Sequence, residues 1–333
     1  MSKGDKALHK AKILKNDEFY TQITDIENEL KHYRQHFKDA VVFCNCDDPD
    51  CSNFWKYFHL YFKFLGLKKL ITTHYDANEP TYKMEYEGGN DSDTTVGVIT
   101  PLKQNGDFRS PECIDLLKQS DIVVTNPPFS LFREYVAQLI SNDKKFLIIG
   151  NMNCVTYKEI FPLIQNNMMW VGANEKRGTR KGNSLCFGVP EGFSGKTIDV
   201  NGVPMAQVSA WWFTNLDIVK RHETIDLSEK YIPEKFPKYD NYDAINVNKT
   251  SGIPYDYDGV MGVPISFMDK YCPEQFEIIG IAKRGAGDPA LKSKVYTKED
   301  YENYSDLNAG PVLIDENGKL YNTYPRILIK RKE

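Results

Sequence analysis

The sequence predicts an α/β fold: an open, largely parallel sheet flanked by helices, followed by a smaller mixed α/β region. Two observations indicate this class. Short apolar runs typical of buried strands alternate with amphipathic or aromatic-rich segments typical of helices, and this order implies right-handed crossovers between parallel strands. After Trp170, glycine, proline and tyrosine become frequent, and prolines exclude long helices there: Pro233, Pro237, Pro254, Pro264 and Pro273.

The first predicted elements are a helix, a strand, a second helix and a second strand. Apolar and aromatic side chains recur at helical spacing within residues 22–37, which predicts an amphipathic helix. The apolar run 41–46 predicts a strand. The aromatic-rich segment 54–65 predicts a helix that ends at Gly66, and residues 69–75 predict the next strand.

The later elements are mostly strands. The run 122–125 is apolar throughout and predicts a buried parallel strand, and the segment after it has apolar residues at helical spacing. The other strands and helices are predicted from similar patterns. The strands are 95–100, 146–150, 208–214 and 276–281, and the helices are 131–140 and 157–164. We expect the sheet to end near Leu216-Asp217, which divides the chain into residues 1–218 and 219–333.

Composition excludes several classes of protein. In 333 residues with 41% hydrophobic content, no apolar run is long enough to span a membrane, and no signal peptide is visible. The seven cysteines are typical of reduced thiols in a cytoplasmic protein. Cys44, Cys46 and Cys51 lie close together but lack paired C-x-x-C spacing, so we expect no metal site.

Net charge is −4, so any contact with nucleic acid must come from local charge. A basic loop is expected at about 173–205. Its candidates for phosphate contact are Lys176, Arg177, Arg180 and Lys181. Weaker candidates of the same kind are Lys283, Arg284, Arg326, Lys330, Arg331 and Lys332. For each cluster the alternative is a solvated surface without a DNA contact.

The tetrapeptide Asn126-Pro127-Pro128-Phe129 follows the predicted buried strand and carries the most specific chemistry in the chain. The Asn side-chain carbonyl and the carbonyl of Pro127 can together accept both N–H hydrogens of a planar amine, because proline restricts the backbone on either side. An aromatic ring at Phe129 offers a face for a planar base. The alternative is a rigid loop without chemistry, but the carboxyl end of a strand is where open α/β sheets bind ligands.

A nucleotide-containing cofactor in such a sheet requires a polar first turn, an acid after the second strand and a group for the base. The first requirement is met by Asp48, Pro49, Asp50, Ser52 and Asn53, which follow the first strand. Asp76 follows the second strand, and Asp107-Phe108 combines a carboxylate with an aromatic ring. The alternatives are that Asp48 and Asp50 only cap a helix and that Asp107 is a turn residue. The first turn also lacks the usual glycines.

Several further segments, spread over roughly residues 17–281, are distinctive. They include Asp17-Glu18-Phe19-Tyr20-Thr21, Cys46-Asp47-Asp48-Pro49, Asn126-Pro127-Pro128-Phe129, Thr156-Tyr157-Lys158-Glu159-Ile160-Phe161-Pro162, Trp212-Phe213-Thr214-Asn215-Leu216-Asp217 and Tyr257-Asp258-Gly259-Val260-Met261-Gly262-Val263-Pro264. Together these segments resemble one family, the EcoRI-type adenine-specific DNA methyltransferases. The resemblance implies a Rossmann-like S-adenosylmethionine-dependent catalytic sheet in residues 1–218 and a C-terminal mixed α/β target-recognition region in residues 219–333.

The resemblance also implies the reaction and its partners. S-adenosylmethionine would donate a methyl group directly to adenine N6, after the adenine is flipped out of double-stranded DNA, with no metal required. Phe19, Tyr20 and Thr21 would contact the methionine end of the cofactor, and Asn126 would hold the amine. The enzyme is expected to belong to a restriction-modification system, to come from a phage, or to act as an orphan modification enzyme. A restriction endonuclease acting on the same site, without a physical complex, is compatible with this, and a monomer is expected.

Two other functions are compatible with the tetrapeptide. The same chemistry serves enzymes that methylate RNA amines or glutamine amides in proteins, although the large C-terminal region favours DNA. A catalytically silent DNA-binding module would keep the fold and bind the cofactor without methyl transfer. An intact Asn126-Pro127-Pro128-Phe129 argues against this third function.

Overall fold

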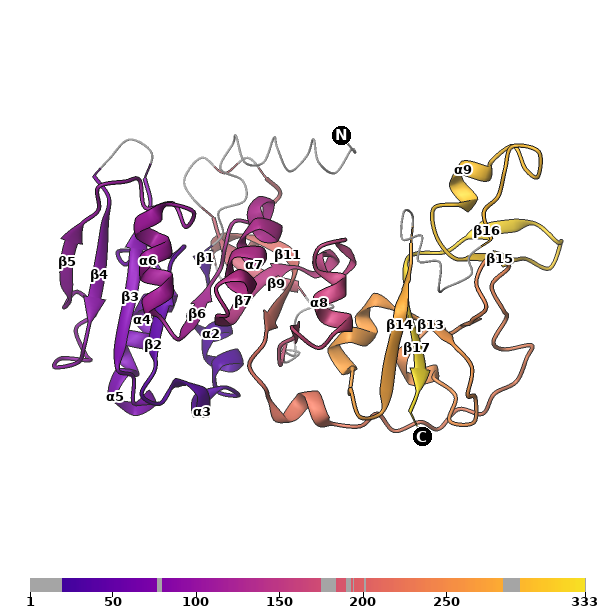
Figure 1. Cartoon of the computed structure of the whole chain (residues 1–333), viewed down its shortest axis with the longest axis horizontal. Coiled ribbons are helices and arrows are strands. Elements are labelled where there is room, and N and C mark those ends of the chain that lie inside the picture. The colour runs from indigo at the N-terminus through magenta and orange to yellow at the C-terminus, as the bar shows by residue number, and fades with distance from the viewer. Residues whose placement is uncertain are drawn as a thin grey trace. The chain divides into compact units, whose positions relative to one another are not determined.

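A computed structural model describes residues 20–76, 80–174, 184–189, 193, 195–200, 202–283 and 294–332. The chain divides into two compact units, which are described separately (Figure 1). Unit 1 comprises residues 1–152 and 169–218, and unit 2 comprises residues 153–168 and 219–333. Unit 2 therefore includes a segment that precedes the last strands of unit 1 along the chain.

Unit 1 is built on one mixed sheet of 11 strands, in the order β1-β9-β11-β7-β6-β2-β3-β4-β5, with β8 and β10 also paired to β11. The strands are β1 (Tyr20–Thr21), β2 (Val41–Cys44), β3 (Lys69–His74), β4 (Tyr82–Tyr86), β5 (Val98–Pro101), β6 (Ile122–Thr125), β7 (Lys145–Asn151), β8 (Trp170–Val171), β9 (Ser184–Gly188), β10 (Ile198–Val200) and β11 (Val203–Thr214). The large α/β sheet agrees with the predicted fold class.

Parallel pairing is confined to the middle of this sheet. Strand β2 pairs in parallel with β3 and β6, and β6 pairs in parallel with β7, as the sequence predicts. The expectation of a largely parallel sheet is wrong at both edges, where β4, β5, β9 and β11 pair antiparallel with their neighbours. Strands β3 and β4 are joined by a short connection, and such connections favour antiparallel neighbours, whereas parallel strands require a long crossover.

The helices of unit 1 pack around the central strands, and Figure 1 shows α6 in front of them. They are α2 (Ile23–Leu30), α3 (Arg34–Phe37), α4 (Asn53–Leu60), α5 (Phe62–Leu65), α6 (Pro111–Gln119) and α7 (Phe132–Ser141), with the 3₁₀ turn η1 (Phe129–Leu131). The 3₁₀ turn η2 (Met152–Thr156) begins at Met152 of unit 1, and its other residues belong to unit 2. Val42, Val124 and Leu147 from β2, β6 and β7 share one core with Phe54 and Phe58 of α4. This buried packing holds the ends of the central strands in place.

Several predicted helices are shorter or interrupted. The segment 22–37 forms two helices, and 54–65 is divided at Tyr61, although Gly66 ends it in the left-handed conformation (φ 67°) as predicted. The helix predicted at 157–164 is only α8 (Phe161–Gln165). Pro162 is tolerated only in the first turn of a helix, so α8 begins just before it.

Two elements were not predicted although their patterns are readable. In β4, Tyr82, Met84 and Tyr86 alternate with charged residues, which is a strand pattern. Helix α6 begins with Ser110, whose side chain accepts a hydrogen bond from the Cys113 backbone N–H, followed by proline at the first turn. The segment 173–205, expected as one basic loop, contains strands β9 and β10 and the start of β11.

Unit 2 has a four-stranded sheet and a separate hairpin. Its elements are α8 (Phe161–Gln165), η3 (Val219–His222), β12 (Ile245–Asn246), η4 (Thr250–Gly252), β13 (Met261–Pro264), η5 (Ile265–Lys270), β14 (Phe276–Ala282), α9 (Tyr304–Leu307), β15 (Val312–Ile314), β16 (Leu320–Asn322) and β17 (Arg326–Arg331). The sheet order is β12-β13-β17-β14, and β15 pairs with β16 beside α9 (Figure 1). The pairing of β14 with β17 shifts register between Ile278 and Gly280, which is a β-bulge.

Candidate active site

The candidate site lies where the sheet of unit 1 changes its winding direction. Strand β2 has β3 on one side and β6 on the other, so the chain leaves β2 towards one edge and later returns to its opposite side. The loops that follow β2 and β6 therefore diverge from each other at the carboxyl ends of these two strands. Open α/β sheets bind ligands in this crevice.

The loop after β2 is held by hydroxyl groups of β3 and by its own helix cap. Thr72 Oγ1 donates to the Cys44 carbonyl at 3.0 Å, and Thr73 Oγ1 donates to the Asn45 carbonyl at 3.1 Å. Ser52 begins α4 by accepting hydrogen bonds from the backbone N–H groups of Phe54 and Trp55. Short polar side chains thus fix this turn in the absence of the usual glycines.

Asp47 joins this turn to the loop after β6. Its side chain is buried, and Oδ1 accepts a hydrogen bond from Ser52 Oγ at 2.9 Å. Its Oδ2 accepts from the Thr125 hydroxyl, and the backbone N–H of Asn126 also donates to the carboxylate. Burial raises the pKa of Asp47 to about 7, against the opposing effect of these three donors.

The tetrapeptide begins directly after β6. Asn126 is partly exposed, although its Oδ1 is shielded from solvent, and Pro127 is buried. The Phe129 ring is 9% exposed and lies edge-on to Phe187 at 6.3 Å between centroids. Phe129 thus has a protein partner on one side, and Pro128 precedes the short turn that leads into α7.

Strand β1 lies beside the first turn. Thr21 pairs with Phe187 of β9, and its carbonyl accepts a hydrogen bond from Asn53 Nδ2 at 2.7 Å. Tyr20 is 39% exposed next to it. The structure therefore brings Thr21, Asn53 and Phe129 into one neighbourhood through Phe187. Phe19 lies outside the described residues.

The other acids of the first turn are already engaged within the protein. Asp48 Oδ2 lies 2.8 Å from His74 Nδ1 at the end of β3, and its Oδ1 accepts from the Asp50 backbone N–H. Asp50 Oδ2 accepts from the Tyr82 hydroxyl at 3.2 Å. Asp76 follows β3 by two residues and is half-buried. Asp48 and Asp50 therefore tie the turn to β3 and β4, and Pro49 lies between them.

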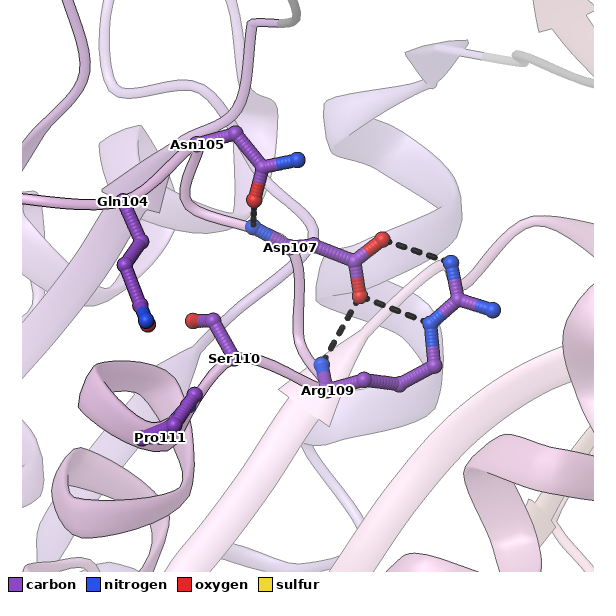
Figure 2. Close-up of a pocket in the computed structure, with 6 residues that line it drawn as sticks. All are labelled: Gln104, Asn105, Asp107, Arg109, Ser110 and Pro111. Carbon is purple, nitrogen blue, oxygen red and sulfur yellow. Dashed lines mark hydrogen bonds and ion pairs between the residues drawn. The ribbon is translucent and has the colours of Figure 1, made fainter.

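Asp107 and Phe108 lie on a loop that borders a cavity of about 330 Å³. Figure 2 shows the Asp107 carboxylate turned towards the Arg109 guanidinium, with bonds of 2.8 Å to Nε and 2.7 Å to Nη2. A second carboxylate, Glu134 on α7, lies 3.2 Å from Arg109 Nη1. The cavity is lined by Gln104, Asn105, Asp107, Arg109, Ser110 and Pro111. Asp107 forms a bidentate ion pair at the cavity wall, and its Oδ1 also accepts from the Arg109 backbone N–H, as a turn residue does.

This loop is held tightly against the end of β3. Gly106 has a φ of 73°, and a Cβ added there would collide with the His74 carbonyl oxygen. The Phe108 ring is buried edge-on against Tyr135 at 5.0 Å, and the Phe108 carbonyl accepts from Gln138 Nε2 at 2.9 Å. Phe108 therefore anchors the loop in the core, and only a glycine suits the close approach at position 106.

Helix α7 connects three of these loops, which sequence patterns alone did not indicate. It follows the tetrapeptide directly, Tyr135 donates a hydrogen bond to Asn45 Oδ1, and Gln138 holds the Phe108 loop. Asn45, Thr125 and Tyr135 were not among the predicted site residues, and Asp47 appeared only within the segment Cys46-Asp47-Asp48-Pro49 of the family resemblance. A usable signal existed for Asn45, Asp47 and Thr125, because polar residues at the carboxyl ends of buried strands border the ligand crevice.

Two buried polar atoms near the first turn lack a hydrogen-bond partner among the residues that the structure describes. They are Thr21 Oγ1 and Asn45 Nδ2, and both residues are at most 4% exposed. Buried polar atoms in proteins are nearly always hydrogen-bonded, so these two atoms are candidates for contact with a polar ligand.

The basic residues that were predicted to contact DNA phosphates lie mostly outside the described residues or are already bonded within the protein. Lys176, Arg177, Arg180 and Lys181 all lie outside the described residues. In unit 2, Arg326 is only 9% exposed, so its assignment to a solvated or DNA-contacting surface is not supported. Lys283 donates to the Thr156 carbonyl and Lys332 to the Pro273 carbonyl at 2.6 Å.

Neither a metal site nor a membrane-spanning helix is present in the residues that the structure describes. Within them, no group of three or more His, Cys, Asp or Glu side chains is arranged to hold a metal ion. The helices of this part of the chain include none that is long and apolar enough to cross a membrane.

Comparison with known proteins identifies relatives over almost the whole chain. Residues 7–332 match the family described as adenine-specific methyltransferase EcoRI. The chain is 52% identical to the type II methyltransferase M.EcoRI of Escherichia coli over 298 residues, which cover 84% of this chain and 90% of the relative.

Two mycoplasma proteins match at greater length. The chain is 36% identical to the type II methyltransferase M.MgeORF184P of Mycoplasma genitalium and 36% identical to M.MpnI of Mycoplasma pneumoniae, with 98% of each chain covered in both comparisons. No solved structure matches the chain significantly.

Proposed function

The chain belongs to the EcoRI family of adenine-specific methyltransferases, and from this premise we propose how its residues carry out the reaction. The protein is a DNA methyltransferase that modifies adenine, and its family uses S-adenosylmethionine in general. One observation supports our proposal for where methyl transfer takes place. Asn126-Pro127 lies beside the first turn, at the switch point of the sheet.

In this proposal the two regions of the chain have different roles. The parallel strands β3-β2-β6-β7 form a Rossmann-like cofactor-binding sheet within residues 1–218. Residues 219–333 form the target-recognition region, whose four-stranded sheet and hairpin offer loops for reading DNA. The basic residues at 176, 177, 180 and 181 would contact DNA phosphates, which carry no sequence information themselves.

The cofactor would lie across the carboxyl ends of β2, β3 and β6. The buried atoms Thr21 Oγ1 and Asn45 Nδ2 fit its amino-acid end, because a hydroxyl can serve the ammonium and an amide N–H the carboxylate. Asp76 would bind the ribose hydroxyls, and the loop of Asp107 and Phe108 would hold the adenine at the cavity wall. The Asp107 carboxylate is paired with Arg109. For Asp107 to accept a hydrogen bond from the exocyclic amine, Arg109 must therefore share this carboxylate or release it.

The reaction needs an amine acceptor that is held and made nucleophilic. S-adenosylmethionine supplies a methyl group on a good leaving group, so direct displacement requires no covalent enzyme intermediate. The Asn126 side-chain carbonyl and the Pro127 carbonyl accept the two N6 hydrogens of an adenine rotated out of duplex DNA. Phe129 would support the ring by stacking, on the side not packed against Phe187.

The enzyme would work as a monomer and without a stable protein partner. A restriction endonuclease with the same recognition sequence would act on the same DNA independently. Since duplex DNA is the substrate, we place the enzyme in the cytoplasm.

The direct test of this function is to incubate the purified protein with labelled S-adenosylmethionine and unmethylated genomic DNA. The DNA is then digested to nucleosides, and we expect label in N6-methyladenine that maps to a short motif. Label in another nucleoside, or label only in RNA or protein while DNA stays unlabelled, would contradict the assignment.

Asn126→Ala should abolish most turnover without loss of cofactor binding. Removing a single positioned hydrogen-bonding group at a reacting atom typically lowers kcat by about 10²–10³-fold. The measurements are single-turnover methylation and equilibrium binding of S-adenosylmethionine. Asn28→Ala is the matched control, because the Asn28 side chain only caps a carbonyl within α2. Equal losses of turnover and cofactor binding in Asn126→Ala would point to a structural role instead.

A further inference from the structure

We propose that Asp47 is a positioning residue that couples the cofactor-binding turn to the Asn126 loop through the Thr125 hydroxyl and the Asn126 backbone N–H. This inference rests on the proposed function, since it assigns a role within the same site. It adds a residue that contacts neither substrate in the proposal and acts through its neighbours.

The carboxylate of Asp47 bonds to both loops at once. Oδ1 accepts from Ser52, which caps α4 and thereby sets the first turn. Oδ2 accepts from Thr125, which is 78 residues away along the chain. The Thr125 hydroxyl and the Ser52 hydroxyl are each buried, so neither bond is exchanged with solvent.

The bond from the Asn126 backbone N–H has a geometric consequence. It restrains the peptide plane between Thr125 and Asn126, and the Asn126 Cα, from which the side chain projects, belongs to that plane. Pro127 has a restricted φ and limits the residue before it, so the carbonyl of Pro127 follows the same orientation. A shift of the carboxylate would therefore move both proposed acceptors of the adenine amine.

The ionised form is the one that suits three donors. A protonated carboxyl group turns one oxygen into a donor that faces another donor, which weakens the bridge. Burial raises the pKa of Asp47 to about 7, so this change falls in the range of an activity assay. The titratable groups that face Asp47 from the first turn, β2 and α7 are Asp48, Cys44, Cys46, Cys51 and Tyr135.

Most of these neighbours titrate well above pH 7, outside the range of the activity assay. Burial raises the pKa of Cys51 to about 11 and raises the pKa values of Cys44, Cys46 and Tyr135 well above their ordinary values. An acidic limb near neutral pH in the wild-type profile, absent from Asp47→Asn, would therefore belong to Asp47.

The test is a double-mutant cycle on single-turnover methylation of DNA. Asp47→Asn and Thr125→Val each remove one side of the bridge, and we expect each to lower the rate about 10–100-fold, as small misplacements of reacting groups do. The double variant should be no slower than Asp47→Asn alone, because both changes break the same link. Thr125→Ser keeps the hydroxyl and should restore most of the rate.

The matched control is Thr73→Val, which removes a buried hydroxyl bond to the same turn without touching the bridge. Its effect should multiply with that of Asp47→Asn. Cofactor binding and thermal unfolding of every variant show whether it is folded. Multiplicative effects of Asp47→Asn and Thr125→Val in folded variants, or an unchanged acidic limb in Asp47→Asn, would overturn the proposal. Failure of the wild-type protein to methylate adenine would instead overturn the proposed function.

Discussion

At the scale of single residues, burial decides what the acids of the first turn do. Asp47 is enclosed by donors from two loops, whereas Asp48 and Asp50 face His74 and Tyr82 at the edge of the turn. Three acids that are nearly equivalent in the sequence therefore have different partners. Their spacing predicts that the turn binds a ligand, but it does not distinguish the acid that bridges the two loops.

Asp47 should make stability depend on pH in a definite direction. Its pKa rises from 3.8 to about 7 on folding, so the folded chain binds this proton more tightly than the unfolded chain. The stability contributed by the protonated group is complete below about pH 4 and is lost as pH rises to about 7. The difference in free energy of unfolding between wild type and Asp47→Asn should therefore shift against wild type over this interval.

Urea unfolding of both proteins at several pH values between about 4 and 8 measures that difference. Thr73→Val provides the reference, because it alters the same turn without removing a titratable group. A difference between wild type and Asp47→Asn that stays constant with pH would mean that Asp47 keeps an ordinary pKa.

At the scale of elements, turns and caps were more predictable than element lengths. Gly66 was predicted to end the helix after residue 65, and it does so because only a residue that tolerates positive φ fits there. The apolar spacing of residues 157–164 predicts a longer helix than α8, because that spacing does not reflect the limit that Pro162 sets on the start of a helix. Residues such as glycine and proline set where a helix must begin or end. Apolar spacing shows only which segments can form a helix.

Gly66→Ala should lower the free energy of unfolding by about 1 kcal/mol, the cost of placing an L side chain at positive φ. The added Cβ meets only ordinary contacts at 3.6 Å, so strain in the backbone accounts for the change. Gly66→Asn is the matched control and should cost less, because Asn tolerates this conformation better. Equal losses measured by urea unfolding would indicate a packing effect instead.

At the scale of the whole molecule, unit 2 is assembled from two separate stretches of chain. Helix α8 precedes the last strands of unit 1, yet Gln165 Nε2 donates to the carbonyls of Ile278 and Ile279 at 3.3 and 3.0 Å. These carbonyls lie at the bulge of β14, where pairing with β17 is interrupted. A segment distant in sequence thus satisfies backbone groups that the sheet leaves open.

Gln165→Ala should loosen unit 2 locally. Loss of the two hydrogen bonds leaves the bulge carbonyls less satisfied, at a cost of roughly 1–2 kcal/mol. Hydrogen exchange of peptides that cover β14 and β17 should accelerate. All four tryptophans lie in unit 1, so the midpoint of urea unfolding followed by tryptophan fluorescence should stay unchanged. An unchanged exchange rate in β14 would contradict the role given to Gln165.

The sequence by itself determined the family, the buried strand that leads into Asn126-Pro127-Pro128-Phe129 and the polar character of the first turn. These are properties of contiguous residues, and their chemistry can be read without knowing what lies beside them. Only the tertiary structure showed that β2 and β6 are neighbours, that Asp47 bonds to Thr125 and that Arg109 holds Asp107. Such contacts depend on which strands pair and which side chains packing leaves buried, and strand order is set by the whole sheet.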